Sequence, residues 1–316
     1  MARTATVVVA VAGFGACTSP AGPMPGQAWE PMASLPIPVR AAAAAVAGNR
    51  IYVVGGTGAG GRTSAFQILD VPSGVWSYGP NLPVATDWGS AAWVGNRLHF
   101  LGGVTEQVAA SPQHWVYEAS SDEWTAGSPL PSASAGSAIA TYDSKIFIFG
   151  GIEGPGAHSD HTLIYDVSTS DWSTGQPVPS ARINWVGAAL DQRILVVGGG
   201  TPGPETTGEL LSYAPGQDAW TVLTPIPLPR EAHGAATVGS LFCAAGGRLA
   251  AAGNFNTPFA DTSCYDAETE KWVPMPALPT ARQELVMVSM GDFIIAVGGR
   301  DESGSPMADL TRLRLR

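Results

Sequence analysis

A Gly-Gly pair and a tryptophan recur six times along this 316-residue chain at nearly constant spacing. The pairs begin at Gly55, Gly102, Gly150, Gly198, Gly246 and Gly298, and the tryptophans are Trp29, Trp76, Trp124, Trp172, Trp220 and Trp272. Each tryptophan lies 26 residues before the next pair, whereas 21 to 26 residues separate each pair from the following tryptophan. One half of the unit therefore has a fixed length, and the other half contains a surface loop. A period near fifty residues predicts a β-propeller.

Each unit divides into four expected strands, named a to d from the ring centre outward. In the first unit we expect strand a at residues 41–47, strand b at 50–54, strand c at 64–70 and strand d around Trp76. Gly48 and Asn49 form a tight-turn signal between a and b. Four later units carry a tyrosine seven residues before the tryptophan: Tyr117, Tyr165, Tyr213 and Tyr265. The variable length therefore lies in the loop between strands b and c.

The recurring Gly-Gly, Tyr-Asp and Trp markers resemble the Kelch repeat, and the resemblance covers residues 27–316. It implies an all-β, six-bladed β-propeller. No tryptophan follows Gly298, and no strands a, b or c precede Trp29. We therefore expect an N-terminal strand at residues 27–32 to complete the last blade, which leaves only short and protected edges.

The N-terminus is read as a targeting segment. A short positive end and an apolar run at residues 1–16 are typical of a secretory signal peptide. The Gly-Ala-Cys junction ending at Cys17 resembles the lipobox of bacterial lipoproteins, which implies lipidation of Cys17. An ordinary signal peptide with an incidental cysteine is the alternative. Residues 17–26, rich in Pro and Gly, are expected to form a flexible tether, and the protein is expected to be exported to the cell envelope.

Strand direction places the b–c loops and the d–a loops on one face, at the mouth of the central channel. The candidate ligand-binding residues there are Arg40, Asp87, Trp88, Arg182, Asn184, Trp185, Arg230, Glu231, His233 and Arg282. The resemblance implies that the arginines line the mouth and contact an acidic ligand, while flat rings suit stacking on a sugar or peptide. The alternative is structural: arginines that cap strand ends or pair with carboxylates such as Glu284, and aromatic rings that pack under the loops.

Two other sets of residues have ligand or redox chemistry. His158, Asp160 and His161 lie close together in one b–c loop, but no further ligand is visible, so we expect no metal and no cofactor. Cys243 and Cys264 fall on neighbouring strands b and c, where an exported protein can form a disulfide. The alternative is that both are small apolar core residues.

The leading functional hypothesis is an exported, non-catalytic binding scaffold. It would hold a small acidic sugar, a polysaccharide or a partner protein at the channel mouth, and it is expected to be a monomer whose only membrane contact is the lipid anchor. A net charge of −10 argues against nucleic acid as a partner. The resemblance also implies an alternative, a carbohydrate-active enzyme of the sialic acid mutarotase type, but no catalytic residue can be assigned from the sequence.

Overall fold

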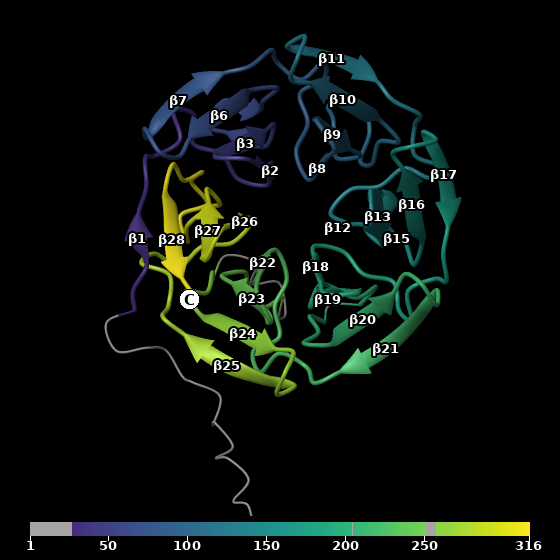
Figure 1. Cartoon of the computed structure of the whole chain (residues 1–316), viewed down its shortest axis with the longest axis vertical. Helices are drawn as coiled ribbons and strands as arrows, with labels where there is room; N and C mark the ends of the chain where they lie inside the picture. Colours follow the sequence, from purple (N-terminus) through teal and green to yellow (C-terminus); the bar gives the residue numbers. More distant parts are fainter. Residues whose placement is uncertain (1–26, 204, 251–256) are drawn as a thin grey trace, which may run out of the picture.

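The computed structural model describes residues 27–203, 205–250 and 257–316. In this part of the chain the regular elements are all β-strands, and six four-stranded antiparallel sheets are arranged as blades around a central axis (Figure 1). The prediction of an all-β, six-bladed propeller is confirmed. The expected signal peptide, Cys17 and the tether lie outside the described residues. Among the residues described, no helix has the length and apolarity needed to cross a membrane.

The blades follow one another in sequence, and the strands of each blade run from the axis outward. Blade 1 contains β2 (Ala43–Ala47), β3 (Arg50–Val54), β6 (Phe66–Asp70) and β7 (Val75–Tyr78), and blade 2 contains β8 (Ser90–Val94), β9 (Arg97–Leu101), β10 (His114–Glu118) and β11 (Glu123–Ala126). Blade 3 contains β12 (Ala138–Tyr142), β13 (Lys145–Phe149), β16 (Thr162–Asp166) and β17 (Asp171–Thr174), and blade 4 contains β18 (Val186–Leu190), β19 (Arg193–Val197), β20 (Leu210–Ala214) and β21 (Ala219–Leu223). Blade 5 contains β22 (Gly234–Val238), β23 (Leu241–Ala245), β24 (Thr262–Asp266) and β25 (Lys271–Met275).

Blade 6 joins the two ends of the described chain. Its strands are β26 (Val286–Met290), β27 (Phe293–Val297), β28 (Leu310–Arg314) and, on the outside, β1 (Glu30–Pro31). Glu30 pairs with Arg312 and Pro31 with Thr311 in an antiparallel register. The outer strand is shorter than the expected 27–32. Two small ribbons extend the b–c loops of blades 1 and 3: β4 (Thr57–Gly58) with β5 (Gly61–Arg62), and β14 (Ile152–Gly154) with β15 (Ala157–His158).

The recurring tryptophans join each blade to the preceding one. Every one of the six indole N–H groups donates a hydrogen bond of 2.8–3.1 Å to a backbone carbonyl of that blade. The pairs are Trp29 with Pro276, Trp76 with Ala33, Trp124 with Pro80, Trp172 with Ser128, Trp220 with Gln176 and Trp272 with Thr224. The indole therefore supplies both apolar area and the polar bond that its N–H requires.

The Gly-Gly pair permits a close backbone approach between blades. In blade 2, Gly102 and Gly103 have φ of 65° and 96°, and a Cβ on Gly102 would lie 2.2 Å from the carbonyl oxygen of Ser134. The N–H of Gly103 donates to that same carbonyl at 2.7 Å. The second glycine of every pair makes the equivalent bond to the next blade. A side chain at the first position would push the two blades apart.

The core is divided among the blade interfaces. Six apolar clusters are buried, and each combines residues of two neighbouring blades. Between blades 1 and 2, for example, Phe66 packs edge-on against Tyr117, with ring centroids 4.8 Å apart. Because every interface is of this kind, the six blades form a rigid frame for the loops at both ends.

Candidate functional site

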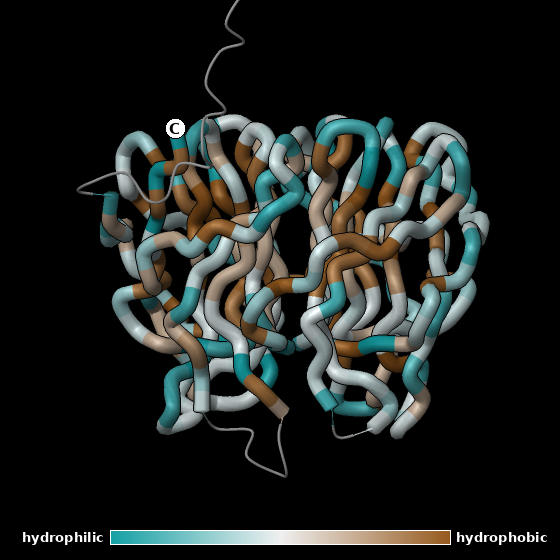
Figure 2. The backbone as a smooth tube through the Cα atoms, turned by 90° about the horizontal axis from the view of Figure 1, so that it is seen from below, coloured by the Kyte–Doolittle hydropathy of each residue, from teal (hydrophilic) through white to brown (hydrophobic). Residues whose placement is uncertain are grey.

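A central channel of about 470 Å³ runs along the axis. It is lined by the six innermost strands, whose side chains there are mostly alanine, glycine, serine and valine. Figure 2 shows the propeller from the side, with the C-terminus of the chain on one face. The b–c loops and the d–a loops surround the channel mouth on the opposite face, as strand direction predicts.

Six backbone hydrogen bonds form a closed ring around this mouth. The residues, here called the inner ring, are Ala41, Trp88, Gly136, Asn184, Ala232 and Glu284. The N–H of each donates to the carbonyl oxygen of the ring residue in the preceding blade, over 2.6–3.0 Å. All six have φ between 50° and 62°. For a residue other than glycine this conformation costs about 1–2 kcal/mol, so the closed ring is built at the expense of local strain, as is common at functional sites.

Large and small side chains alternate around the inner ring. Trp88, Asn184 and Glu284 come from blades 2, 4 and 6, while alanine or glycine occupies the same position in blades 1, 3 and 5. All six residues line the channel. The channel mouth is therefore surrounded by an aromatic ring, an amide and a carboxylate, one on every second blade. These are complementary functions for holding a small polar molecule.

Glu284 lies within a cluster of arginines. Its Oε2 accepts a hydrogen bond from Nη1 of Arg40 at 2.5 Å, and its Oε1 lies 2.9 Å from Nε of Arg300 and 3.3 Å from Nη1 of Arg248. Arg248 also donates from Nε to Glu231 at 2.8 Å. Both carboxylates are nearly buried, so the arginines stabilise charges that would otherwise be costly. Counted over these five side chains alone, three arginines face two glutamates.

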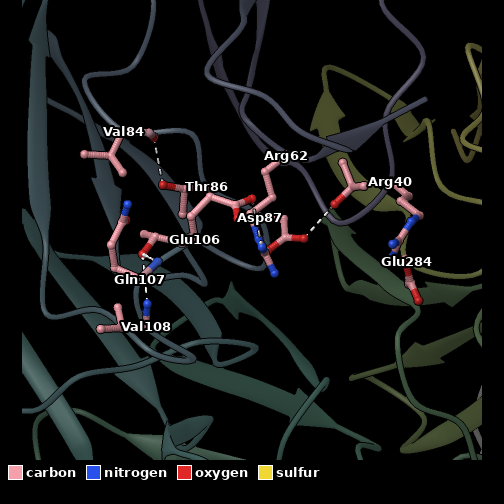
Figure 3. Close-up of polar contacts among 12 residues, drawn as sticks. Arg40, Arg62, Val84, Thr86, Asp87, Glu106, Gln107, Val108 and Glu284 are labelled. Atoms are coloured by element: carbon pink, nitrogen blue, oxygen red, sulfur yellow. Dashed lines mark hydrogen bonds and ion pairs between the residues drawn. The ribbon is translucent and has the colours of Figure 1, made fainter. Parts of the chain in front are cut away.

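A second ionic group lies beside the first, in blades 1 and 2. Asp87 is 4% exposed and accepts from Thr57 Oγ1 at 2.6 Å and from Arg62 Nε at 2.8 Å. Figure 3 shows Arg62 reaching Asp87, with Glu106 beyond it and Arg40 facing Glu284. The hydrogen bond to Asp87 raises the pKa of Arg62 above its ordinary value. Asp87 therefore serves to position Arg62 at the rim of the mouth.

Three of the predicted mouth arginines lie elsewhere, and this corrects the expectation that they converge on the axis. Arg182, Arg230 and Arg282 are 4%, 0% and 0% exposed and do not line the channel. Each donates from Nη1 to the carbonyl of the first glycine of its own blade, at 3.1–3.3 Å. Arg182 also pairs with Glu209, and Arg230 with Asp261. They join the ends of strands b and c, as the structural alternative held.

Arg40 differs from these three because it stands one residue later in its repeat. Arg182, Arg230 and Arg282 each lie 16 residues before their Gly-Gly pair, and in the first unit that position is Val39. In an extended chain a shift of one residue turns the side chain to the opposite side. Arg40 therefore points to the mouth, where it is 28% exposed, together with Asp87 and Glu231 at the same repeat position.

The predicted aromatic residues also divide. Trp88 belongs to the inner ring, whereas Trp185 and His233 take the next position and are each 2% exposed. Trp185 donates from Nε1 to the carbonyl of Phe149 at 3.0 Å. Among the residues that the structure describes, neither ring nitrogen of His233 has a hydrogen-bond partner. Complete burial, together with the charge of Arg230, holds the pKa of His233 well below the ordinary value. Trp185 and His233 therefore lie at blade interfaces.

Sequence reasoning missed three arginines of the mouth and undervalued one carboxylate. Arg248 and Arg300 directly follow the Gly-Gly pairs of blades 5 and 6, and this fixed position was a usable signal. Glu284 aligns with Trp88 and Asn184 once the repeats are superimposed by their glycines. Arg62 lies in the loop of variable length, where repeat alignment gives no position.

Cys243 and Cys264 are direct cross-strand partners in blade 5 and are joined by a disulfide. His161 lies 2.7 Å from Glu153. The described residues contain no group of three or more His, Cys, Asp or Glu side chains arranged to hold a metal ion.

The fold and the channel mouth define a six-bladed propeller with a ligand-sized axial site. The family model described as the KLHDC2/KLHL20/DRC7 Kelch-repeats domain matches residues 88–299, and the Kelch motif matches residues 38–83. This chain therefore belongs to the Kelch-repeat family.

Two further comparisons show how far this likeness extends. The solved structure of YjhT is similar to the chain, with a TM-score of 0.78 and 16% identity, over 89% of this chain and 96% of that one. In all, 1031 solved chains match, so the fold is too widespread to assign a function. No curated protein matches the sequence.

Proposed function

We propose that this Kelch propeller is a binding module that holds a small anionic ligand, such as an acidic sugar, at the channel mouth. The observation that supports the proposal best is the convergence of Trp88, Asn184 and Glu284 on one opening, with three arginines around Glu284. The channel volume of about 470 Å³ lies within the range of small-molecule sites.

Each group at the mouth has a role in such a complex. The indole of Trp88 is half-buried and offers a face for stacking on a sugar ring. The side chain of Asn184 both donates and accepts hydrogen bonds, and Glu284 accepts them from hydroxyl groups. Arg40 is the most exposed cation of the Glu284 cluster, at 28% against 16% for Arg300 and 10% for Arg248. It is therefore the group we expect to meet the ligand's carboxylate.

We also propose that the protein lies in the cell envelope. We expect export and lipidation at Cys17, with the propeller acting as a monomer. Gln27, the first described residue, donates a hydrogen bond to the carbonyl of Arg314, and Leu315 bonds to Asp292 in an a–b turn. The described chain thus begins on the face opposite the mouth. An N-terminal anchor on that side would leave the mouth directed away from the membrane.

A second candidate function is an enzyme of the sialic acid mutarotase type. It is favoured by Glu284, a buried carboxylate at the mouth that could move a proton during ring opening while Arg40 holds the acid group. The rate of anomer interconversion, followed by proton NMR, tests it directly. Acceleration by the wild type that is lost in Glu284→Gln supports the enzyme, and an unaltered spontaneous rate rejects it.

The binding proposal is tested by calorimetric titration with sialic acid, uronic acids and neutral sugars. An acidic sugar is expected to bind more tightly than its neutral analogue, and Arg40→Gln should weaken that preference about tenfold, because a hydrogen bond to a charged group is lost. Arg97→Gln is the matched control, since Arg97 is 53% exposed in an ion pair with Glu118 away from the mouth. Equal affinity for acidic and neutral sugars, or equal losses in both variants, would refute the proposal.

A further inference from the structure

Around the inner ring lies a second circle of residues, which we call the bridge ring. In each blade, the residue before the inner-ring position forms a backbone bridge with the residue after the Gly-Gly pair. The six bridges are Arg40 with Thr57, Asp87 with Val104, Ala135 with Ile152, Ile183 with Gly200, Glu231 with Arg248, and Gln283 with Arg300. The register of the repeat thus places two residues per blade on the rim of the mouth.

The bridge ring has two chemically distinct arcs. The charged arc spans blades 5, 6 and 1 and contains Glu231, Arg248, Gln283, Arg300 and Arg40. The aliphatic arc spans blades 2, 3 and 4 and contains Val104, Ala135, Ile152 and Ile183. The other bridge residues of blades 2 and 4 are Asp87, whose charge is paired with Arg62, and Gly200. In this ring of six blades, blade 1 lies opposite blade 4 (Figure 1). The bridges of these two blades therefore place Arg40 and Ile183 on opposite sides of the channel mouth.

The aliphatic arc is not needed to build the blades. The same repeat positions carry arginine, glutamate, glutamine or glycine in blades 5, 6 and 4, where the same backbone bridge forms. Yet Val104, Ile152 and Ile183 are only half-buried, so part of each side chain remains in water on a face rich in charge. A ligand that covers these grouped aliphatic side chains removes apolar surface from water, which lowers the free energy of the complex.

We propose that the ligand of this mouth is an amphiphilic acid, a ring-shaped molecule with a carboxylate on one side and an aliphatic arm on the other. This inference rests on the proposed function and specifies its ligand class. The carboxylate binds at Arg40 in the charged arc, the ring stacks on Trp88, and the arm lies over Ile152 and Ile183. The two arcs therefore fix the ligand's orientation as well as its class.

Four probes measure the contributions of the carboxylate and of the aliphatic arm to affinity separately. They are methyl and butyl β-D-glucuronide, and methyl and butyl β-D-glucoside. Each methylene removed from water raises affinity about fourfold. With partial coverage of the arm, butyl glucuronide is expected to bind about tenfold more tightly than methyl glucuronide. The glucuronides should in turn bind about tenfold more tightly than the matching glucosides, because only they have a carboxylate.

Single substitutions show which arc produces each gain in affinity. Ile183→Ser, and separately Ile152→Ser, should abolish most of the butyl gain and leave the affinity for methyl glucuronide unchanged. Arg40→Gln should remove the carboxylate gain and leave the glucosides unchanged. Val75→Ser is the matched control, since Val75 is 61% exposed on the outer strand β7, and it should change neither gain.

The outcomes distinguish the inference from the function on which it rests. If methyl and butyl glucuronide bind equally, or if the butyl gain survives both isoleucine variants, the amphiphilic class is overturned while the anion site stands. If no glucuronide binds more tightly than its glucoside, both are overturned. A butyl gain confined to wild type and the Val75→Ser and Arg40→Gln proteins supports the inference.

Discussion

A buried pair of histidines should make the interface between blades 2 and 3 sensitive to acid. His99 and His114 are 2% and 3% exposed, and Nδ1 of His99 lies 2.9 Å from Nε2 of His114. The ring of His114 packs edge-on against Tyr165 of blade 3, with centroids 4.8 Å apart. Burial, then the charges of His114 and Arg97, lowers the pKa of His99 from 6.5 to about 4. Burial also lowers the pKa of His114.

The sign and size of the effect follow from the linkage between proton binding and folding. Because each pKa is lower in the folded protein, the unfolded chain binds a proton at pH values where the folded protein does not. The free energy of unfolding therefore falls as the pH falls below 6.5 and towards 4. For His99 alone, the shift from 6.5 to about 4 gives a loss of about 2 kcal/mol between about pH 7 and pH 5. His114 adds a loss in the same direction.

The measurement is the free energy of unfolding from urea titrations at a series of pH values in this interval. The double variant His99→Phe, His114→Phe should lose about 2 kcal/mol less than the wild type on acidification. Phenylalanine already occupies the matching repeat positions at Phe147 and Phe66. His161→Phe is the control, because His161 is 45% exposed. An equal acid loss in the wild type and the double variant would refute the reasoning.

Three further predictions concern stability. Arg282→Met should destabilise the fold by about 3 kcal/mol in urea titrations, because it removes the donor to the buried carbonyl of Gly298. Arg40→Gln should cost less, because Arg248 and Arg300 still pair with Glu284; equal costs would contradict the assignment of Arg282 as structural. Gly102→Ala should yield little soluble protein, since its Cβ would meet a carbonyl oxygen at 2.2 Å, and a melting temperature like the wild type would show that the blades can shift. Replacing both Cys243 and Cys264 by alanine should cost about 3 kcal/mol for a sequence separation of 21, and an unchanged unfolding midpoint under oxidising conditions would exclude that contribution.

The sequence alone was enough for the fold because the fold repeats. Each Gly-Gly pair makes one kind of inter-blade hydrogen bond and each tryptophan makes another. Six copies in phase therefore indicate the same blade geometry six times. The closure by Trp29 could also be predicted, because an outer-strand tryptophan without its own inner strands must complete another blade. Local signals of this kind depend on the backbone, which the repeat conserves.

The candidate site could be predicted only in part. Trp88, Asn184, Asp87 and Glu231 were placed at the correct mouth, because strand direction alone assigns a loop to a face. Arg182, Arg230 and Arg282 were misplaced, because a residue type and its neighbouring proline do not tell which way an extended chain turns the side chain. Counting back 16 residues from the glycines separates these three arginines from Arg40. Their burial could not be predicted, because it depends on hydrogen bonds from each guanidinium to a carbonyl of its own blade.

The sequence by itself determined the number of blades, their strands and the face on which the loops meet, because these follow from spacing along the chain. Only the tertiary structure decided which side chains share the mouth. Glu284 and Arg40 are 244 residues apart in the chain, yet ring closure brings their charged groups to 2.5 Å. The two arcs of the bridge ring likewise exist only once six separate segments surround one axis. Contacts across a closed ring depend on how the ends meet, and no local pattern encodes that distance.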